Sequence, residues 1–158
     1  MVGLLAIVGL VAATQATTGP PGRAAQAEQL MLALVNEVRD EHALAHLTPR
    51  TDLAEVAHGW SVAMARTGVL EHNPDHPEQI CCWTAVSENV AFADPSPWRL
   101  RGDPVERVTR ELHQALLDSP PHRANLLDAT VDEVGIGIEV GPDGRVWITQ
   151  NFRRHDGS

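Results

Sequence analysis

The sequence predicts a single α+β domain, and three observations support this fold class. Apolar residues recur at helical spacing in the earlier segments of the chain, whereas the last segment alternates at the period of a β-hairpin. Helices and strands do not alternate regularly along the chain, which argues against a doubly wound parallel sheet. The chain has 158 residues, about the length of one domain, and its 43% hydrophobic and 21% charged residues are typical of a globular protein.

The N-terminal segment predicts export. Residues 4–13 are a run of uncharged, mostly apolar residues, too short to span a bilayer but typical of the hydrophobic region of a signal peptide. We expect a signal peptide over residues 1–16, with cleavage as late as residue 27, and a flexible lead-in over residues 17–27. A buried apolar strand or helix is the alternative interpretation. No other segment is apolar enough for a transmembrane helix, so we expect an extracellular protein.

Two amphipathic helices are expected in the first half of the chain. Apolar residues at positions i, i+4 and i+8 indicate a helix over about residues 28–42. A second apolar stripe follows, with Thr51 or Asp52 as its N-terminal cap and Gly68 as the glycine that ends it.

The second half of the chain is expected to contain a third helix and a hairpin. Residues 70–103 are irregular apart from one short strand, Ser87–Ala93. Asp103, a proline at the first helical position and Glu106 form a capping box at the start of the third helix. Alternating apolar residues on both sides of a Gly-Pro-Asp-Gly turn predict a β-hairpin over residues 134–152.

The charge composition excludes one large class of partner. The chain carries 21 acidic residues against 12 basic ones, which gives a formal net charge of −9. Because phosphate contacts supply most of the affinity of nucleic-acid-binding proteins, we expect no nucleic-acid partner. The two cysteines are too few for a disulfide scaffold or a tetracysteine zinc site.

Three further segments carry polar residues that a solvated loop does not need. They are residues 68–72 (GVLEH), 87–91 (SENVA) and 119–127 (SPPHRANLL). Together with LVNEVR in the first helix and WITQNF in the last strand, their order resembles the CAP superfamily: the cysteine-rich secretory, antigen 5 and pathogenesis-related 1 proteins, also called the SCP domain. The resemblance is to the compact secreted bacterial form. It covers residues 28–154 and leaves a short tail at 155–158.

The resemblance implies an α-β-α sandwich with a surface cleft that holds two histidines and two acids and binds a divalent metal in some members. His72 matches the first histidine, Glu88 the first acid and His122 the second histidine. The second acid falls near Ser119, where this chain has none, and Asp118 stands one residue away. Family members have been ascribed sterol and lipid binding, and some of them protease activity.

The residues themselves leave three interpretations of His72, Glu88 and His122 open. The three groups can hydrogen-bond one another and hold their loops to the sheet, they can bind a metal weakly, or they can act in catalysis. Two imidazoles suit zinc or copper, and a carboxylate can complete such a site or orient an imidazole. His76 and Asp118 are candidate extra ligands.

Other polar residues are expected to serve the structure. Arg123 and Asn125 are predicted to fix their loop by hydrogen bonds, and Gln150 to act as a buried amide that holds the last strand. Cys81 and Cys82 are adjacent. A vicinal disulfide, free thiols and a link to another chain all stay open for this pair.

Two function classes follow from these residues. We expect a monomeric binding module for a small hydrophobic ligand, a peptide or a glycan, which requires no cofactor and for which Zn²⁺ is a candidate ion. The alternative is a metal-assisted, peptidase-like hydrolase, in which zinc on His72 and His122 activates water and Glu88 is the general base. The missing second acid counts against the enzyme, so we assign no catalytic residue except Glu88 under this alternative.

Overall fold

The computed structural model describes residues 22–94 and 104–157. The predicted signal peptide, residues 17–21 of the lead-in and the predicted cap Asp103 lie outside the described residues. Along the chain the elements are α1 (Arg23–Glu41), β1 (Thr48–Pro49), α2 (Thr51–Thr67), α3 (His76–Gln79), β2 (Trp83–Ala93), α4 (Pro104–Asp118), α5 (Pro120–Leu126), β3 (Glu133–Val140) and β4 (Val146–His155). Within these described ranges, no helix combines the length and apolarity that a membrane span requires.

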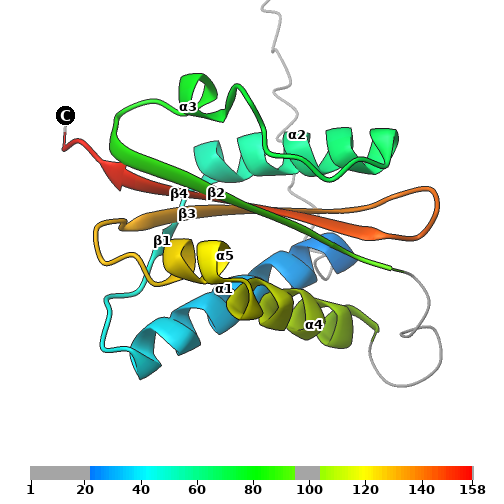
Figure 1. Ribbon diagram of the computed structural model, residues 1–158, viewed down its shortest axis with the longest axis horizontal. Helices are drawn as coiled ribbons and strands as arrows, with labels where there is room; N and C mark the ends of the chain where they lie inside the picture. The colour runs from blue at the N-terminus through cyan, green and yellow to red at the C-terminus, as the bar shows by residue number, and fades with distance from the viewer. Residues whose placement is uncertain (1–21, 95–103, 158) are drawn as a thin grey trace, which may run out of the picture.

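The strands form one mixed sheet between two helical layers. Their order is β1-β3-β4-β2, with β1 parallel to β3 and the other two pairs antiparallel. Helices α2 and α3 lie on one side of the sheet, and α1, α4 and α5 lie on the other (Figure 1). This arrangement confirms the predicted α+β class and the α-β-α sandwich.

The two faces of β3 explain the alternation seen in the sequence. Val134, Ile136 and Ile138 belong to the main hydrophobic core, which they share with α1 and α4. The glycines between them face α2: a β-carbon added at Gly137 would lie 2.1 Å from the backbone nitrogen of His58. Helix α2 therefore packs directly on the strand backbone, and only glycine permits this approach.

Several element boundaries differ from the prediction. Helix α1 begins at Arg23, before residue 28, and β2 begins at Trp83, before Ser87. Strand β2 is longer because it pairs with β4 along its length, a long-range contact that local patterns do not reveal. The predicted cap of α2 is wrong, since Arg50 occupies the N-cap position and makes no side-chain cap bond. Gly68 ends α2 in the left-handed region, with a φ of 71°, as predicted.

The segment 119–127 is a helix and not the loop that the sequence suggested. Ser119 is extended, as expected of a residue before proline, and two prolines open α5. His122, which we expected on a loop, therefore lies on a helix, whereas Glu88 lies on β2, within the strand expected over residues 87–93. The hairpin prediction is confirmed, with Gly141 N–H donating to the carbonyl of Arg145 across the turn at 2.8 Å.

The close approach of α2 makes Gly137 a sensitive position. We expect Gly137→Ala to lower the free energy of unfolding by about 3 kcal/mol, the upper range for overpacking, because the backbone of α2 must move. Gly59→Ala is the matched control within α2, where a β-carbon meets no atom within 4 Å. It should stabilise the protein by about 0.5–1 kcal/mol. Urea denaturation measures both, and similar values for the two variants would contradict this packing.

Candidate functional site

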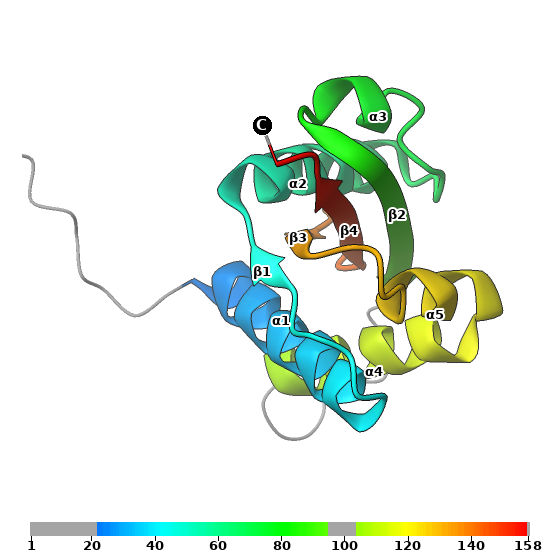
Figure 2. The same cartoon turned by 90° about the vertical axis from the view of Figure 1, so that its left-hand side faces the viewer.

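The candidate site lies at β2, an edge strand of the sheet. In the register of β2 and β4, Glu88 lies opposite Asn151 and Asn89 opposite Gln150. Side chains alternate along a strand, so neighbouring Glu88 and Asn89 point to opposite faces. Figure 2 shows α3 on one side of β2 and α5 on the other. Residues from both helical layers can therefore meet around this edge.

Glu88 holds the segment that follows α2. Its Oε1 atom accepts a hydrogen bond from His72 Nδ1 at 2.8 Å and another from the backbone N–H of Asn73 at 2.9 Å. The Glu88 side chain is 2% exposed, whereas that of His72 is 62% exposed. The other oxygen, Oε2, is buried and has no hydrogen-bond partner among the described residues. Because Nδ1 of His72 faces the carboxylate, its Nε2 is the nitrogen left for a ligand.

His122 lies on α5, in the helical layer on the other side of the sheet, and its ring approaches that of His72. Its ring centroid lies 6.4 Å from that of His72, with the ring planes inclined by 56°. Burial lowers the pKa of His122, and the neighbouring His72 lowers it further. The structure thus brings His72, Glu88 and His122 together, although they come from three separate segments.

His76 also lies beside this group, at the start of α3. Burial lowers the pKa of its imidazole, the charge of Glu88 opposes this shift, and that of His72 adds to it. His76 Nε2 is buried without a hydrogen-bond partner among the described residues. Asp118 does not join the cluster: it is exposed at the end of α4, where it accepts a hydrogen bond from Gln114 at 2.8 Å.

Three amides connect the site to the sheet. Asn89 Nδ2 donates to the carbonyl of His122 and to Oε1 of Gln150, both at 3.1 Å. Asn125 Nδ2 donates to Oδ1 of Asn89 at 2.9 Å and to the carbonyl of Glu88 at 3.2 Å. Asn89 and Gln150 are fully buried. Asn89 was missed by the sequence reasoning, and its position next to Glu88 was the available signal.

Arginines fix α5 to α1. Arg123 donates to Nε2 of His42 at 3.1 Å. The buried Arg39 of α1 donates to the carbonyls of Leu126 and Asp128, at 2.9 and 3.0 Å. These carbonyls lie at the C-terminal end of α5, so Arg39 sets the position of the helix that carries His122. The sequence reasoning missed Arg39, because a charged residue near the end of a helix usually faces solvent.

The donor chemistry suits a divalent metal better than the present geometry does. Within residues 22–94 and 104–157, no three histidine, cysteine or acidic side chains are gathered closely enough to hold an ion. A tetrahedral zinc at about 2.0–2.1 Å from each imidazole nitrogen sets two ring centroids closer than the observed 6.4 Å. The exposed His72 ring would have to turn or approach, and this requirement favours weak over tight binding.

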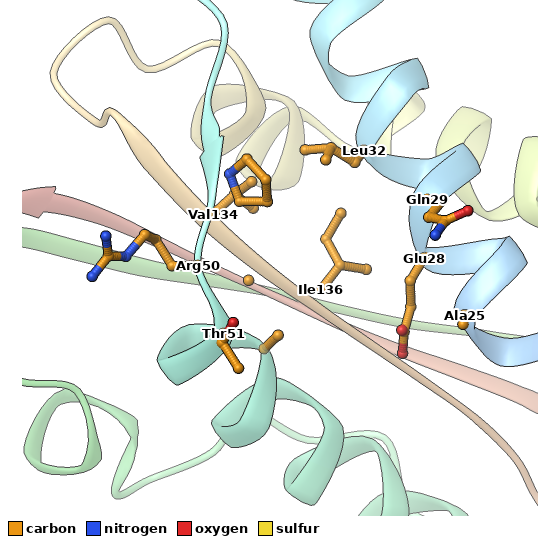
Figure 3. Close-up of a pocket in the computed structure, with 11 residues that line it drawn as sticks. Ala25, Glu28, Gln29, Leu32, Arg50, Thr51, Val134 and Ile136 are labelled. Carbon is orange, nitrogen blue, oxygen red and sulfur yellow. The ribbon is translucent and has the colours of Figure 1, made fainter. Parts of the chain in front are cut away.

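A separate cavity lies at the opposite edge of the sheet, between α1, β1 and α2 (Figure 3). Its volume is about 370 Å³. Glu28 reaches into this region and accepts a hydrogen bond from the N–H of Ile138 at 3.0 Å, while burial raises the pKa of Glu28. The lining is mainly apolar and consists of Ala25, Glu28, Gln29, Leu32, Pro49, Arg50, Thr51, Ala54, Val134, Gly135 and Ile136. It contains none of the predicted site residues.

Comparisons with known proteins agree with this architecture. The model of the CAP family, described as the cysteine-rich secretory protein family, matches residues 32–152. No curated protein matches the chain. Among solved structures, an outer surface protein from Borrelia burgdorferi superposes with a TM-score of 0.67 at 17% identity, over 82% of this chain and 93% of that protein.

Two further solved structures share the fold. An extracellular protein containing an SCP domain from Bacillus anthracis str. Ames has a TM-score of 0.64 at 24% identity, over 87% of this chain and 45% of that one. The structure of NaASP2 with Zn²⁺ has a TM-score of 0.63 at 11% identity, over 84% and 82% of the two chains. At these identities the likeness shows the fold alone.

The amide connections predict that Asn125 positions the site. We expect Asn125→Ala to lower the free energy of unfolding by about 1–3 kcal/mol, because it leaves the Asn89 amide oxygen and the Glu88 carbonyl without a donor. Gln114→Ala is the control, since it removes one exposed hydrogen bond and should cost less than about 0.5 kcal/mol. Equal unfolding midpoints for the two variants would show that this network does not hold α5.

Proposed function

This chain belongs to the cysteine-rich secretory protein family, and on that premise we propose that it is an exported binding module. Its ligand site is the polar cluster of His72, Glu88 and His122 at the β2 edge, which takes a divalent cation weakly. One observation carries the proposal: Glu88 is buried, yet its Oε2 atom has no partner among the described residues. Buried polar atoms are ordinarily hydrogen-bonded, so this oxygen points to a bound species that completes the site.

His76 supports the same conclusion. Its Nε2 atom is a second buried polar atom without a described partner, and its pKa responds to Glu88 and His72. His76 is therefore the extra ligand that we propose, in preference to Asp118, whose carboxylate is directed elsewhere. The polarity of the cluster favours a cation, a peptide or a glycan at this edge over a small hydrophobic molecule.

The chemistry of the donors supports zinc as the cation. Neutral imidazoles and a carboxylate are common zinc ligands, and a carboxylate often orients a ligating histidine through its second nitrogen, as Glu88 orients His72. The relative NaASP2, whose structure was determined with Zn²⁺, supports the same choice. The distance of 6.4 Å between the ring centroids of His72 and His122 supports a modest affinity for zinc.

A metal-assisted hydrolase is the second candidate, and the unpartnered oxygen of Glu88 is the observation that favours it. Zinc held by His72 and His122 would supply an activated water, and Glu88 Oε2 could take a proton from it. The lack of a second acid among the described residues of the cluster weighs against this function, because fewer groups orient a substrate. We therefore favour binding over catalysis.

Zinc titration of the full chain tests the site. By isothermal titration calorimetry we expect one Zn²⁺ per chain at micromolar affinity. His122→Ala removes a ligand, and Glu88→Gln removes the anion that orients His72, so each should weaken binding by at least about tenfold. His46→Ala is the control: that imidazole is exposed and bonds Asp40 instead.

The outcomes separate the two functions. Zinc binding without cleavage of a peptide substrate supports the binding module, whereas cleavage that is lost in Glu88→Gln supports the hydrolase. If micromolar zinc does not bind to the unmodified chain, the metal site and the hydrolase are both wrong.

Export is the remaining part of the proposal. The apolar run at residues 4–13 and the outer-surface and extracellular relatives support it. N-terminal sequencing of the protein from the culture medium should begin between Thr17 and Glu28, because signal peptidase removes the segment before it. Recovery of the chain from the cytosol with Met1 intact would contradict export.

A further inference from the structure

Cys81 and Cys82, the only cysteines of the chain, form a feature that the proposed binding site does not use. Both residues are exposed, at the junction between α3 and β2. Their side chains turn toward each other, and the two sulfurs lie 2.6 Å apart. Two accessible thiols in direct contact are chemically a single redox unit.

Hydrogen bonds to the two cysteine carbonyls hold the pair in place. The buried Arg153 donates from its guanidinium to the carbonyl of Cys81 at 3.1 Å, and the N–H of Asp156 donates to the carbonyl of Cys82 at 3.0 Å. Cys82 adopts a φ of 61°, a left-handed conformation that a residue other than glycine rarely adopts. Strand β4 and the segment after it thus fix both peptide units, while the two sulfurs face solvent.

We infer that Cys81 and Cys82 are a reversible modification site, which an external disulfide oxidises to a vicinal disulfide. The bond closes a ring of eight atoms, made from the two sulfurs, the two Cβ atoms, the two Cα atoms and the carbon and nitrogen of the shared peptide. Such rings are strained and rare, because neighbouring Cα atoms are about 3.8 Å apart, closer than in most disulfides. Here the fold already brings the two sulfurs together, and a partner disulfide can reach both of them.

The reaction is thiol–disulfide exchange with a disulfide RS–SR, either a small molecule or an oxidoreductase. The thiolate of one cysteine attacks one sulfur of RS–SR, which forms a mixed disulfide and releases RS⁻. The thiol of the other cysteine then loses its proton, and its sulfur attacks the cysteine sulfur of the mixed disulfide and releases the second RS⁻. The pair gives up two electrons and two protons in all, and RS–SR becomes two thiols.

Contact with the Cys81 thiol raises the pKa of the Cys82 thiol. Either cysteine can make the first attack. The consequence for the fold is local: the ring fixes the joint between α3, which begins with His76, and β2, which carries Glu88.

Mass spectrometry tests this inference, with glutathione as the probe. The reduced full chain is incubated with mixtures of oxidised and reduced glutathione, trapped with excess N-ethylmaleimide at neutral pH, and weighed intact. We expect a species two hydrogen atoms lighter than the reduced chain, without maleimide or glutathione, which reverts to a doubly alkylated chain after treatment with dithiothreitol.

The single variants provide the matched controls. Cys81→Ser and Cys82→Ser each keep one thiol, so each should accumulate one glutathione adduct under the same conditions. A stable glutathione adduct on the unmodified chain, a disulfide-linked dimer, or two maleimide groups after oxidation would overturn the inference. None of these results depends on whether zinc binds at His72 and His122.

Discussion

The site at the β2 edge depends above all on the hydrogen bonds of one buried amide, Asn89. It joins β2 to β4 through Gln150, holds the carbonyl of His122 on α5, and accepts a hydrogen bond from Asn125. An amide is suited to this position because it donates and accepts at once without carrying a charge. Without Asn89, β2 would lose its hydrogen bonds to the carbonyl of His122 and to the amide of Asn125. His122 would then be held less firmly beside Glu88.

The two faces of the sheet make different kinds of contact. The face toward α1 and α4 buries large aliphatic side chains, and its energy comes from apolar area removed from water. The face toward α2 is nearly flat, because β3 presents glycine there; Ser61 of α2 lies within hydrogen-bond distance of Thr149 and of the carbonyl of Gly137. This tight packing fixes α2 on the sheet, and the segment that follows α2 carries His72 to Glu88. The packing of α2 therefore determines one half of the site and the α5 contacts determine the other.

The sequence predicted the fold class, the hairpin and the glycine that ends α2, because each has a local cause: periodicity, turn residues or a positive φ. It failed where the cause is long-range. The length of β2 comes from its pairing with β4, and α5 is held by Arg39 from a helix far away in the chain. The resemblance to the family selected His72, Glu88 and His122, and the structure places these residues together. The sequence also named His76 as a candidate extra ligand, but Pro74 between His72 and His76 rules out a regular helical spacing, so only the turn of the chain after Pro74 shows that His76 lies beside the other three.

The two oxygens of Glu88 limit what the cluster can do. Oε1 is committed to His72 and to the backbone of Asn73, so any direct contact with a ligand must come from Oε2. A carboxylate that holds an imidazole in this way makes it a better metal ligand, but it also has less freedom to move toward a substrate. A general base must bring its oxygen to the water that attacks the substrate, and the two hydrogen bonds to Oε1 hold the Glu88 side chain in one position. The same geometry that supports Glu88 as an orienting and binding group thus argues against it as a base, and for this reason we place binding before hydrolysis.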